Sequence, residues 1–196
     1  MRKKTGLAGG LLILVMIGLA GCDRTRLAER PDGSVGDQTV IAQIGYDNYW
    51  QHLTSDDGSA FTETELEADD YNWDNYLRLC GGLWPRGFVL MKHTAEGDLT
   101  VSAQTEFLSH LGQIESPEEA MAYIYATNCY LSPAFGEVKQ FVNRTEDGFE
   151  VGVIQYNFIG CGNHAHTQKL FAVKPTGAWE LVKEVKLERG EEFCGD

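Results

Sequence analysis

The stretch SPEEAMAYIYATN, residues 116–128, decides the expected fold, because it holds the clearest helix signal in the chain. Ser116 is a residue type that caps helices, Pro117 suits the first helical position, and Glu119 completes a capping box. Apolar residues then recur at spacings of three and four, which places them on one face of a helix. They are Ala120, Met121, Ile124 and Tyr125. We therefore predict a helix from Pro117 to about Asn128.

Downstream of this helix, β-rich segments alternate with turn residues, which predicts a meander of antiparallel strands. The expected strands are 138–142, 149–159, 166–173 and 179–187, with turns at 146–148 and 175–177. Upstream, a hairpin is predicted from its own turn at 95–98. Its strands are 87–94 and 99–105.

The last expected strand has an amphipathic pattern, which indicates one buried and one solvated face. The apolar residues of one parity are Trp179, Leu181, Val185 and Leu187. The buried face needs a cover, and the predicted helix is the strongest candidate. We therefore predict an α+β fold in which one helix packs on an antiparallel β-meander. A cystatin-like or NTF2-like arrangement would fit by architectural analogy only, and such an analogy carries no function.

The N-terminal segment combines cations, a short uncharged run and a cysteine. Arg2, Lys3 and Lys4 precede the uncharged residues 7–20, and the segment ends in Leu19-Ala20-Gly21-Cys22. The run is shorter than the roughly 20 apolar residues of a membrane-spanning helix and suits a signal peptide. Residues 1–23 resemble the signal peptide and lipobox of bacterial lipoproteins. The resemblance implies cleavage before Cys22 and lipidation of its sulfur.

This resemblance implies a place in the bacterial cell envelope, where lipid on Cys22 holds the protein to a membrane and the domain lies outside the cytoplasm. Several acyl chains hold essentially permanently, since burial is worth about 0.8 kcal/mol per methylene. In enterobacterial lipoproteins, an aspartate after the lipidated cysteine implies inner-membrane retention, and Asp23 occupies that position. The alternative is that Asp23 is an ordinary tether residue.

The chain divides into three expected segments. Residues 1–21 are the lipoprotein signal peptide, and residues 22–38 comprise the lipidated cysteine and a polar, flexible tether. Residues 39–196 are long enough for a single α+β domain with its own core. Within this domain, residues 54–76 are acidic and less regular.

The composition is strongly acidic, with 29 Asp and Glu against 16 Lys and Arg and a formal net charge of −13. Such a field repels nucleic acid and anionic lipid headgroups. We therefore predict no nucleic-acid partner, and we predict contact with the membrane only through the lipid on Cys22.

Four cysteines remain besides Cys22, and an even number in an oxidising compartment predicts two disulfides. The meander brings the end of its long strand and the end of its last strand to the same rim of the sheet. We therefore pair Cys161 with Cys194 and, by elimination, Cys80 with Cys129.

Two histidines form the only local cluster with possible chemistry. His164 and His166 are two residues apart on an extended segment, so they point to the same face. Imidazole nitrogens bind zinc or copper, but a structural zinc site has four ligands and no further histidine is near in sequence. The alternative is a polar strand edge beside a disulfide, and we predict no cofactor.

An aromatic and acidic run at 71–76 is the second candidate site. Trp73 and Tyr76 are of the types that anchor interfaces, and they could line a groove for a sugar or a partner. Alternatively, they pin the loop to the domain. No nucleophile motif is present, and no carboxylate pair stands out.

We therefore expect a non-enzymatic binding or scaffolding module at the membrane surface, with an envelope protein or a glycan as its partner. The alternative is a small metal-dependent or carbohydrate-active enzyme of the envelope. A third metal ligand beside the histidines, or a cleft with two facing carboxylates, would favour that enzyme.

Overall fold

The computed structural model of this chain describes residues 39–41, 43–67, 75–81, 85–157, 160–163, 165–188 and 192–195. The predicted signal peptide, Cys22 and the tether lie outside the described residues. Among the helices of the described ranges, none is both long and apolar enough to cross a membrane.

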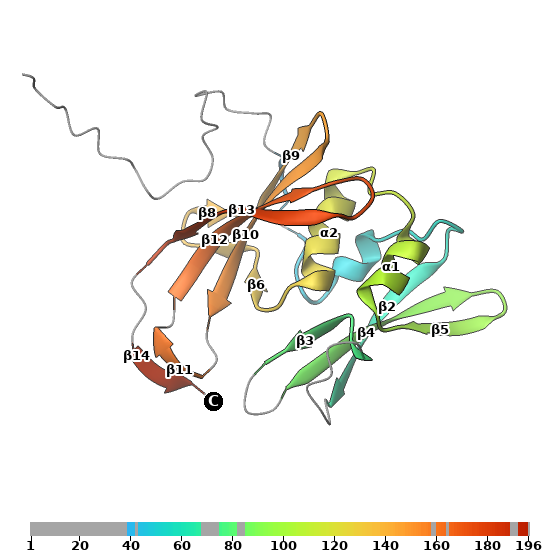
Figure 1. Cartoon of the computed structure of the whole chain (residues 1–196), viewed down its shortest axis with the longest axis horizontal. Coiled ribbons are helices and arrows are strands. Elements are labelled where there is room, and N and C mark those ends of the chain that lie inside the picture. The colour runs from blue at the N-terminus through green and yellow to red at the C-terminus, as the bar shows by residue number, and fades with distance from the viewer. Residues whose placement is uncertain are drawn as a thin grey trace, which may run out of the picture.

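The fold is α+β, as predicted, and every strand pair within the described residues is antiparallel. The larger sheet has the order β1-β9-β10-β12-β13, and β6 also pairs with β10 (Figure 1). Its strands are β1 Thr39–Val40, β6 Leu131–Ser132, β9 Phe141–Thr145, β10 Gly148–Asn157, β12 Ala165–Val173 and β13 Trp179–Lys186.

A second, four-stranded sheet has β4 at its centre, between β2 on one side and β3 and β5 on the other. Its strands are β2 Ala60–Glu67, β3 Arg78–Cys80, β4 Arg86–Thr94 and β5 Gly97–Val101. Two small ribbons complete the strands. They pair β7 Ala134–Phe135 with β8 Val138–Lys139, and β11 Gly160–Asn163 with β14 Glu192–Gly195. The hairpin predicted around residues 95–98 is confirmed as β4 and β5.

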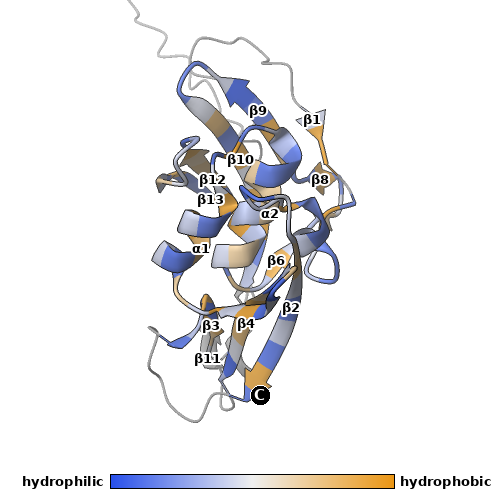
Figure 2. Cartoon of the chain, turned by 90° about the vertical axis from the view of Figure 1, so that its right-hand side faces the viewer, coloured by the Kyte–Doolittle hydropathy of each residue, from blue (hydrophilic) through white to orange (hydrophobic). Residues whose placement is uncertain are grey.

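The predicted helix is confirmed as α2, Pro117–Thr127, and the capping box between Ser116 and Glu119 is present. Its apolar face is wider than the sequence predicted, because seven consecutive residues from Ala120 to Ala126 are buried. A helix that is buried all round must be covered on several sides. Figure 2 shows α2 between the sheet of β9 and β10 and the sheet of β2 and β4. The prediction of one helix on one sheet is therefore corrected to two sheets with α2 between them.

A second helix, α1 Gln104–Leu111, begins where the sequence predicted that the hairpin strand would continue. Phe107 and Leu111 are one turn apart and both buried, which fixes the helix on the core. Leu108 packs on the turn at 175–177, where Gly177 has a φ of +80° and an added Cβ would collide with Leu108. This turn therefore requires glycine.

A short 3-10 helix, η1 Tyr49–His52, packs on α2. The strand predicted over 138–142 is divided into β8 and β9, with the fully buried Gln140 between them. The Gln140 amide donates to the carbonyls of Ile41 and Ile44 and accepts a hydrogen bond from the Tyr125 hydroxyl. Gln140 thus fixes the segment before η1 to α2.

The amphipathic pattern predicted for the last strand is wrong, because all but one of the residues of β13 are exposed. A bulge explains the error: Leu170 pairs with Lys183 but Phe171 pairs with Leu181, so Val182 is an extra residue. The parity therefore changes within the strand. Trp179 packs on Phe171, whereas Val185 packs on Leu170 at the opposite face.

The disulfide between Cys80 and Cys129 is confirmed, with 5.5 Å between the two Cα atoms. It joins the end of β3 to the segment that leaves α2. Only this disulfide is seen in the described structure. In the ribbon of β11 and β14, the backbone of Cys161 lies directly opposite that of Cys194. The bond between these two cysteines stays a prediction.

Strand β2 lies inside the segment that the sequence indicated to be acidic and less regular. Its alternate residues Phe61, Glu63 and Glu65 share one face, as the period of two of a strand requires. Phe61 reaches the core, Glu63 is half-buried and Glu65 is exposed. Along this face, the side chains therefore change from apolar and buried to charged and exposed.

Candidate functional site

A cavity of about 340 Å³ lies between this face of the second sheet and the segment that contains η1. We call it the aromatic pocket. Its aromatic lining consists of Tyr46, Trp50, Phe88 and Tyr130, and its charged lining consists of Asp47, Glu63, Glu65, Arg78 and Arg86. The volume is at the lower end of the range for ligand pockets in proteins.

The register of the second sheet brings one row of the pocket together. Phe88 of β4 pairs with Glu65 of β2 on one side and with Arg78 of β3 on the other. Directly paired residues of antiparallel strands have side chains on the same face. The side chains of Glu65, Phe88 and Arg78 therefore form one row across three strands.

Arg78 is the most deeply buried charge of the pocket, with its side chain 1 % exposed. It donates to the Tyr125 carbonyl at 2.7 Å and to Glu63 at 2.6 Å. Its guanidinium lies 4.1 Å from the ring centre of Phe88 and 5.0 Å from that of Tyr46, within cation–π range. Within the described residues, its Nε is buried with no hydrogen-bond partner.

The Glu63 carboxylate also accepts a hydrogen bond of 2.7 Å from the Tyr49 hydroxyl. Burial raises the pKa of Tyr49, and of its neighbour Tyr46, well above the ordinary value. Both phenols therefore stay protonated and available as donors at neutral pH. The Tyr46 hydroxyl donates to the Asn128 carbonyl and accepts from the Leu131 amide.

The rim carries a second ion pair, between Arg86 and Glu65, whose side chains are 58 % and 45 % exposed. Asp47 is also exposed and has no ion pair or hydrogen bond to its carboxylate in the described structure. Two of the three carboxylates are therefore neutralised by arginines. One negative charge remains at the mouth of the pocket.

Tyr130 stands out by its backbone, since it is the one described non-glycine residue with a positive φ, of 57°. A bulky residue in this region stores strain of order 1–3 kcal/mol, and such residues concentrate at functional sites. The preceding residue is the disulfide-bonded Cys129, and the Tyr130 hydroxyl donates to the Gly81 carbonyl. These bonds hold the strained residue with its ring at the pocket.

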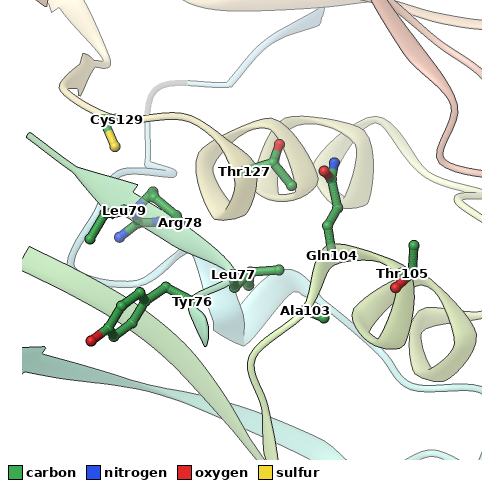
Figure 3. A pocket seen from close by; sticks show the side chains of 9 residues that line it. All are labelled: Tyr76, Leu77, Arg78, Leu79, Ala103, Gln104, Thr105, Thr127 and Cys129. Atoms are coloured by element: carbon green, nitrogen blue, oxygen red, sulfur yellow. The ribbon is translucent and has the colours of Figure 1, made fainter. Parts of the chain in front are cut away.

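A second hollow of about 400 Å³ also borders Arg78 and lies toward the two α-helices (Figure 3). Gln104 extends from the start of α1 toward α2, where its amide donates to the Tyr123 hydroxyl. Thr127 donates to the Tyr123 carbonyl. These polar groups serve contacts within the fold, so the aromatic pocket is the better candidate for a ligand site.

Tyr76, which the sequence singled out, lies at this second hollow and is not part of the aromatic pocket. Its ring packs directly on Gly87 of β4, where an added Cβ would collide with it. This contact fits the alternative that the aromatic residue pins its segment to the domain. Trp73 lies outside the described residues.

His166, the other candidate from the sequence, lies on β12 with its ring stacked on Phe135 at 3.9 Å and on Tyr156 at 4.4 Å. Two rings that both stack on one imidazole must occupy its opposite faces, so His166 lies between them. Its Nδ1 is hydrogen-bonded to the Glu188 carboxylate. His164 lies outside the described residues.

The described residues contain no group of three or more His, Cys, Asp and Glu side chains that could hold a metal ion. His166 is thus placed with aromatic rings and one carboxylate. A metal site at His164 and His166 stays a hypothesis.

Sequence reasoning missed the aromatic pocket because its residues come from five separate segments. Two local signals were nevertheless available. Arg78 interrupts the otherwise apolar run Leu77-Arg78-Leu79-Cys80, and a cation inside a buried strand needs a partner. The alternation of β2 was a second signal, because it supplies that partner as Glu63.

Comparison with known proteins found no matching family model, no similar curated protein and no similar solved structure.

Proposed function

We propose that this chain is a lipid-anchored protein of the bacterial cell envelope whose domain acts as a non-enzymatic binding module at the membrane surface. The lipobox Leu19–Cys22 supports the anchor. The aromatic pocket supports binding. Asp23 favours retention at the inner membrane.

The observation that carries the binding function is the lining of the aromatic pocket. Four aromatic side chains surround a cavity whose charged groups are mostly paired with one another, and aromatic linings with a small number of oriented polar groups are typical of ligand sites. Aromatic residues and arginine are also the types that dominate binding energy at interfaces. The partner is a glycan or a protein of the envelope.

The same lining favours binding over hydrolysis of a glycosidic bond. A glycosidase needs two carboxyl groups that are free to exchange a proton or to attack the sugar. Glu63 is held by Arg78 and Tyr49, and Glu65 is held by Arg86. Of the three carboxylates that line the pocket, only Asp47 therefore lacks a partner in the described structure.

A second disulfide, between Cys161 and Cys194, belongs to this proposal. The envelope is a compartment in which disulfides persist. The paired backbone positions in the ribbon of β11 and β14 support the bond. It would hold the C-terminal segment of the domain to the strand that precedes β12.

Photo-crosslinking in living cells tests the binding function. A photoreactive phenylalanine analogue replaces Trp50 in the full-length chain, and the control carries it at Leu99, an exposed residue of β5. We expect intermolecular adducts from position 50 that are absent from position 99. Equal labelling from both positions would mean that the pocket is not a contact site.

The anchor has its own test in Cys22→Ser. We expect this substitution to abolish lipid labelling and to leave an uncut precursor, since the lipid is attached at the lipobox cysteine. Unchanged labelling and mature size would show that Cys22 is not the acceptor.

A further inference from the structure

We propose that the aromatic pocket binds an uncharged sugar ring, so that the partner of this module is a neutral glycan segment. This inference rests on the proposed binding function and names its ligand class. Three features of the pocket lead to it: its net charge, the use of its aromatic faces, and the donors and acceptors at its rim.

The charge of the pocket disfavours anionic ligands. Its lining holds three carboxylates against two guanidinium groups, in a chain of net charge −13. The two arginines are bound to Glu63 and Glu65, so the positive charge of each guanidinium is already balanced by a carboxylate. A phosphate or a carboxylate would meet the unpaired Asp47 at the mouth and be repelled.

The aromatic faces disfavour cationic ligands in a different way. A cation is attracted to the negative face of an aromatic ring. Here the Arg78 guanidinium already lies over Phe88 and Tyr46, at 4.1 and 5.0 Å from their ring centres. A bound ammonium group would therefore have to compete with this guanidinium for the faces of Phe88 and Tyr46.

Two aromatic side chains remain for a neutral ligand. Trp50 is half-buried and held edge-to-face by Tyr49 at 5.4 Å, and Tyr130 is held in its strained conformation. The C–H groups of a pyranose face carry partial positive charge, so they pack favourably on the negative face of an aromatic ring. Rigid rings lose little conformational entropy when they bind.

The rim supplies matching hydrogen-bonding groups. Sugar hydroxyls both donate and accept, so they need acceptors and donors side by side. Asp47 and Glu65 provide acceptors, and the exposed guanidinium of Arg86 provides donors. An exposed ion pair is worth little by itself, so a ligand can hydrogen-bond with its free edges at small cost.

The test is a calorimetric titration of the full-length protein in a detergent that has no sugar headgroup. The neutral probes are chitotriose, maltotriose and cellotriose, the cationic probe is choline, and the anionic probe is inorganic phosphate. We expect saturable binding of at least one trisaccharide, with choline and phosphate at least 10-fold weaker.

Substitutions in the aromatic pocket show whether the trisaccharide binds there. Trp50→Ala and Arg86→Gln should each weaken the trisaccharide at least 10-fold. Trp179→Ala and Lys169→Gln are matched controls on the larger sheet and should leave it unchanged. Arg86→Gln changes only an exposed pair, so its effect is separable from a loss of folding.

The outcomes separate this inference from the proposed function. Preferential binding of choline or phosphate overturns the sugar assignment but still supports the proposed binding function. Adducts from position 50 without trisaccharide binding also overturn the sugar assignment, but they support the proposed binding module. If neither adducts nor binding is found, both proposals fail, and binding that survives Trp50→Ala and Arg86→Gln places the sugar elsewhere.

Discussion

Nη2 of Arg78 lies 2.6 Å from Oε2 of Glu63, and these two side chains are only 1 % and 13 % exposed. The pair joins β3 to β2, and the second donor group of Arg78 reaches the carbonyl of Tyr125 at the end of α2. The residues that form one wall of the aromatic pocket therefore also connect the second sheet to α2.

Removing both partners of this pair should cost less than the sum of the two single removals. Breaking a buried ion pair leaves an uncompensated charge, so Glu63→Gln should lower the free energy of unfolding by about 3 kcal/mol. In the double variant Glu63→Gln/Arg78→Met, the loss should fall short of the sum of the single losses by about 1–3 kcal/mol. Urea unfolding measures all three values.

The exposed ion pair between Arg86 and Glu65 is the control for this double-mutant comparison. Glu65→Gln should cost below about 1 kcal/mol, because exposed ion pairs are screened by water. If Glu63→Gln costs no more than Glu65→Gln, the buried pair does not stabilise the pocket wall as described.

The buried tyrosines should make the domain sensitive to alkali. Burial raises the pKa of Tyr46, Tyr49 and Tyr125 in the folded protein. A raised pKa means that the folded state binds the proton more tightly. Below a pH of about 10, the pKa of tyrosine in the unfolded chain, these groups therefore leave the free energy of unfolding unchanged. As the pH rises above this value, the free energy of unfolding falls.

A spectroscopic titration checks this linkage. Tyrosinate absorbance and circular dichroism are followed together as the pH is raised. We expect these tyrosines to ionise only as the secondary structure is lost. Complete tyrosine ionisation near pH ~10 with a native circular dichroism spectrum would contradict their burial.

The disulfide pattern should be Cys80–Cys129 together with Cys161–Cys194. Peptide mapping without reduction identifies both, and a Cys129–Cys161 or Cys129–Cys194 peptide would refute it. Removing the first bond with Cys80→Ala/Cys129→Ala should lower the free energy of unfolding by about 4 kcal/mol in the chain-entropy description, since it closes a loop over a sequence separation of 49.

The histidines should be dispensable for folding. His166→Ala removes two stacking contacts, so it should cost about 1 kcal/mol. Zinc titrated into the protein should show no stoichiometric tight binding. Sub-micromolar binding that disappears in His164→Ala/His166→Ala would favour the metal-dependent enzyme instead.

Local signals account for the parts of the fold that the sequence predicted correctly. Ser116 and Glu119 form a capping box within four residues, so the start of α2 was readable. The start of α1 was not readable, because its cap residue Ala103 makes no side-chain hydrogen bond. The faces of β13 were misassigned because the extra residue Val182 changes the parity, and a bulge depends on pairing with β12.

The site was less predictable than the fold because its contacts are long-range. Arg78 meets Glu63 and Tyr46 only after the sheet and η1 have assembled. Trp73 and Tyr76 were singled out because they are close in sequence, whereas the pocket takes Trp50 and Tyr130 from distant segments. Burial and charge pairing, which no local pattern contains, decide which aromatic residues line a cavity.

We propose that the aromatic pocket is the ligand site of this domain. Fluorine NMR of the full-length protein labelled with fluorotryptophan tests it most directly, because each tryptophan gives its own resonance and Trp→Phe variants assign them. On saturation with the tightest-binding trisaccharide, we predict that the Trp50 resonance shifts and that of Trp179 does not. A shift of Trp179 with an unchanged Trp50 would contradict the claim.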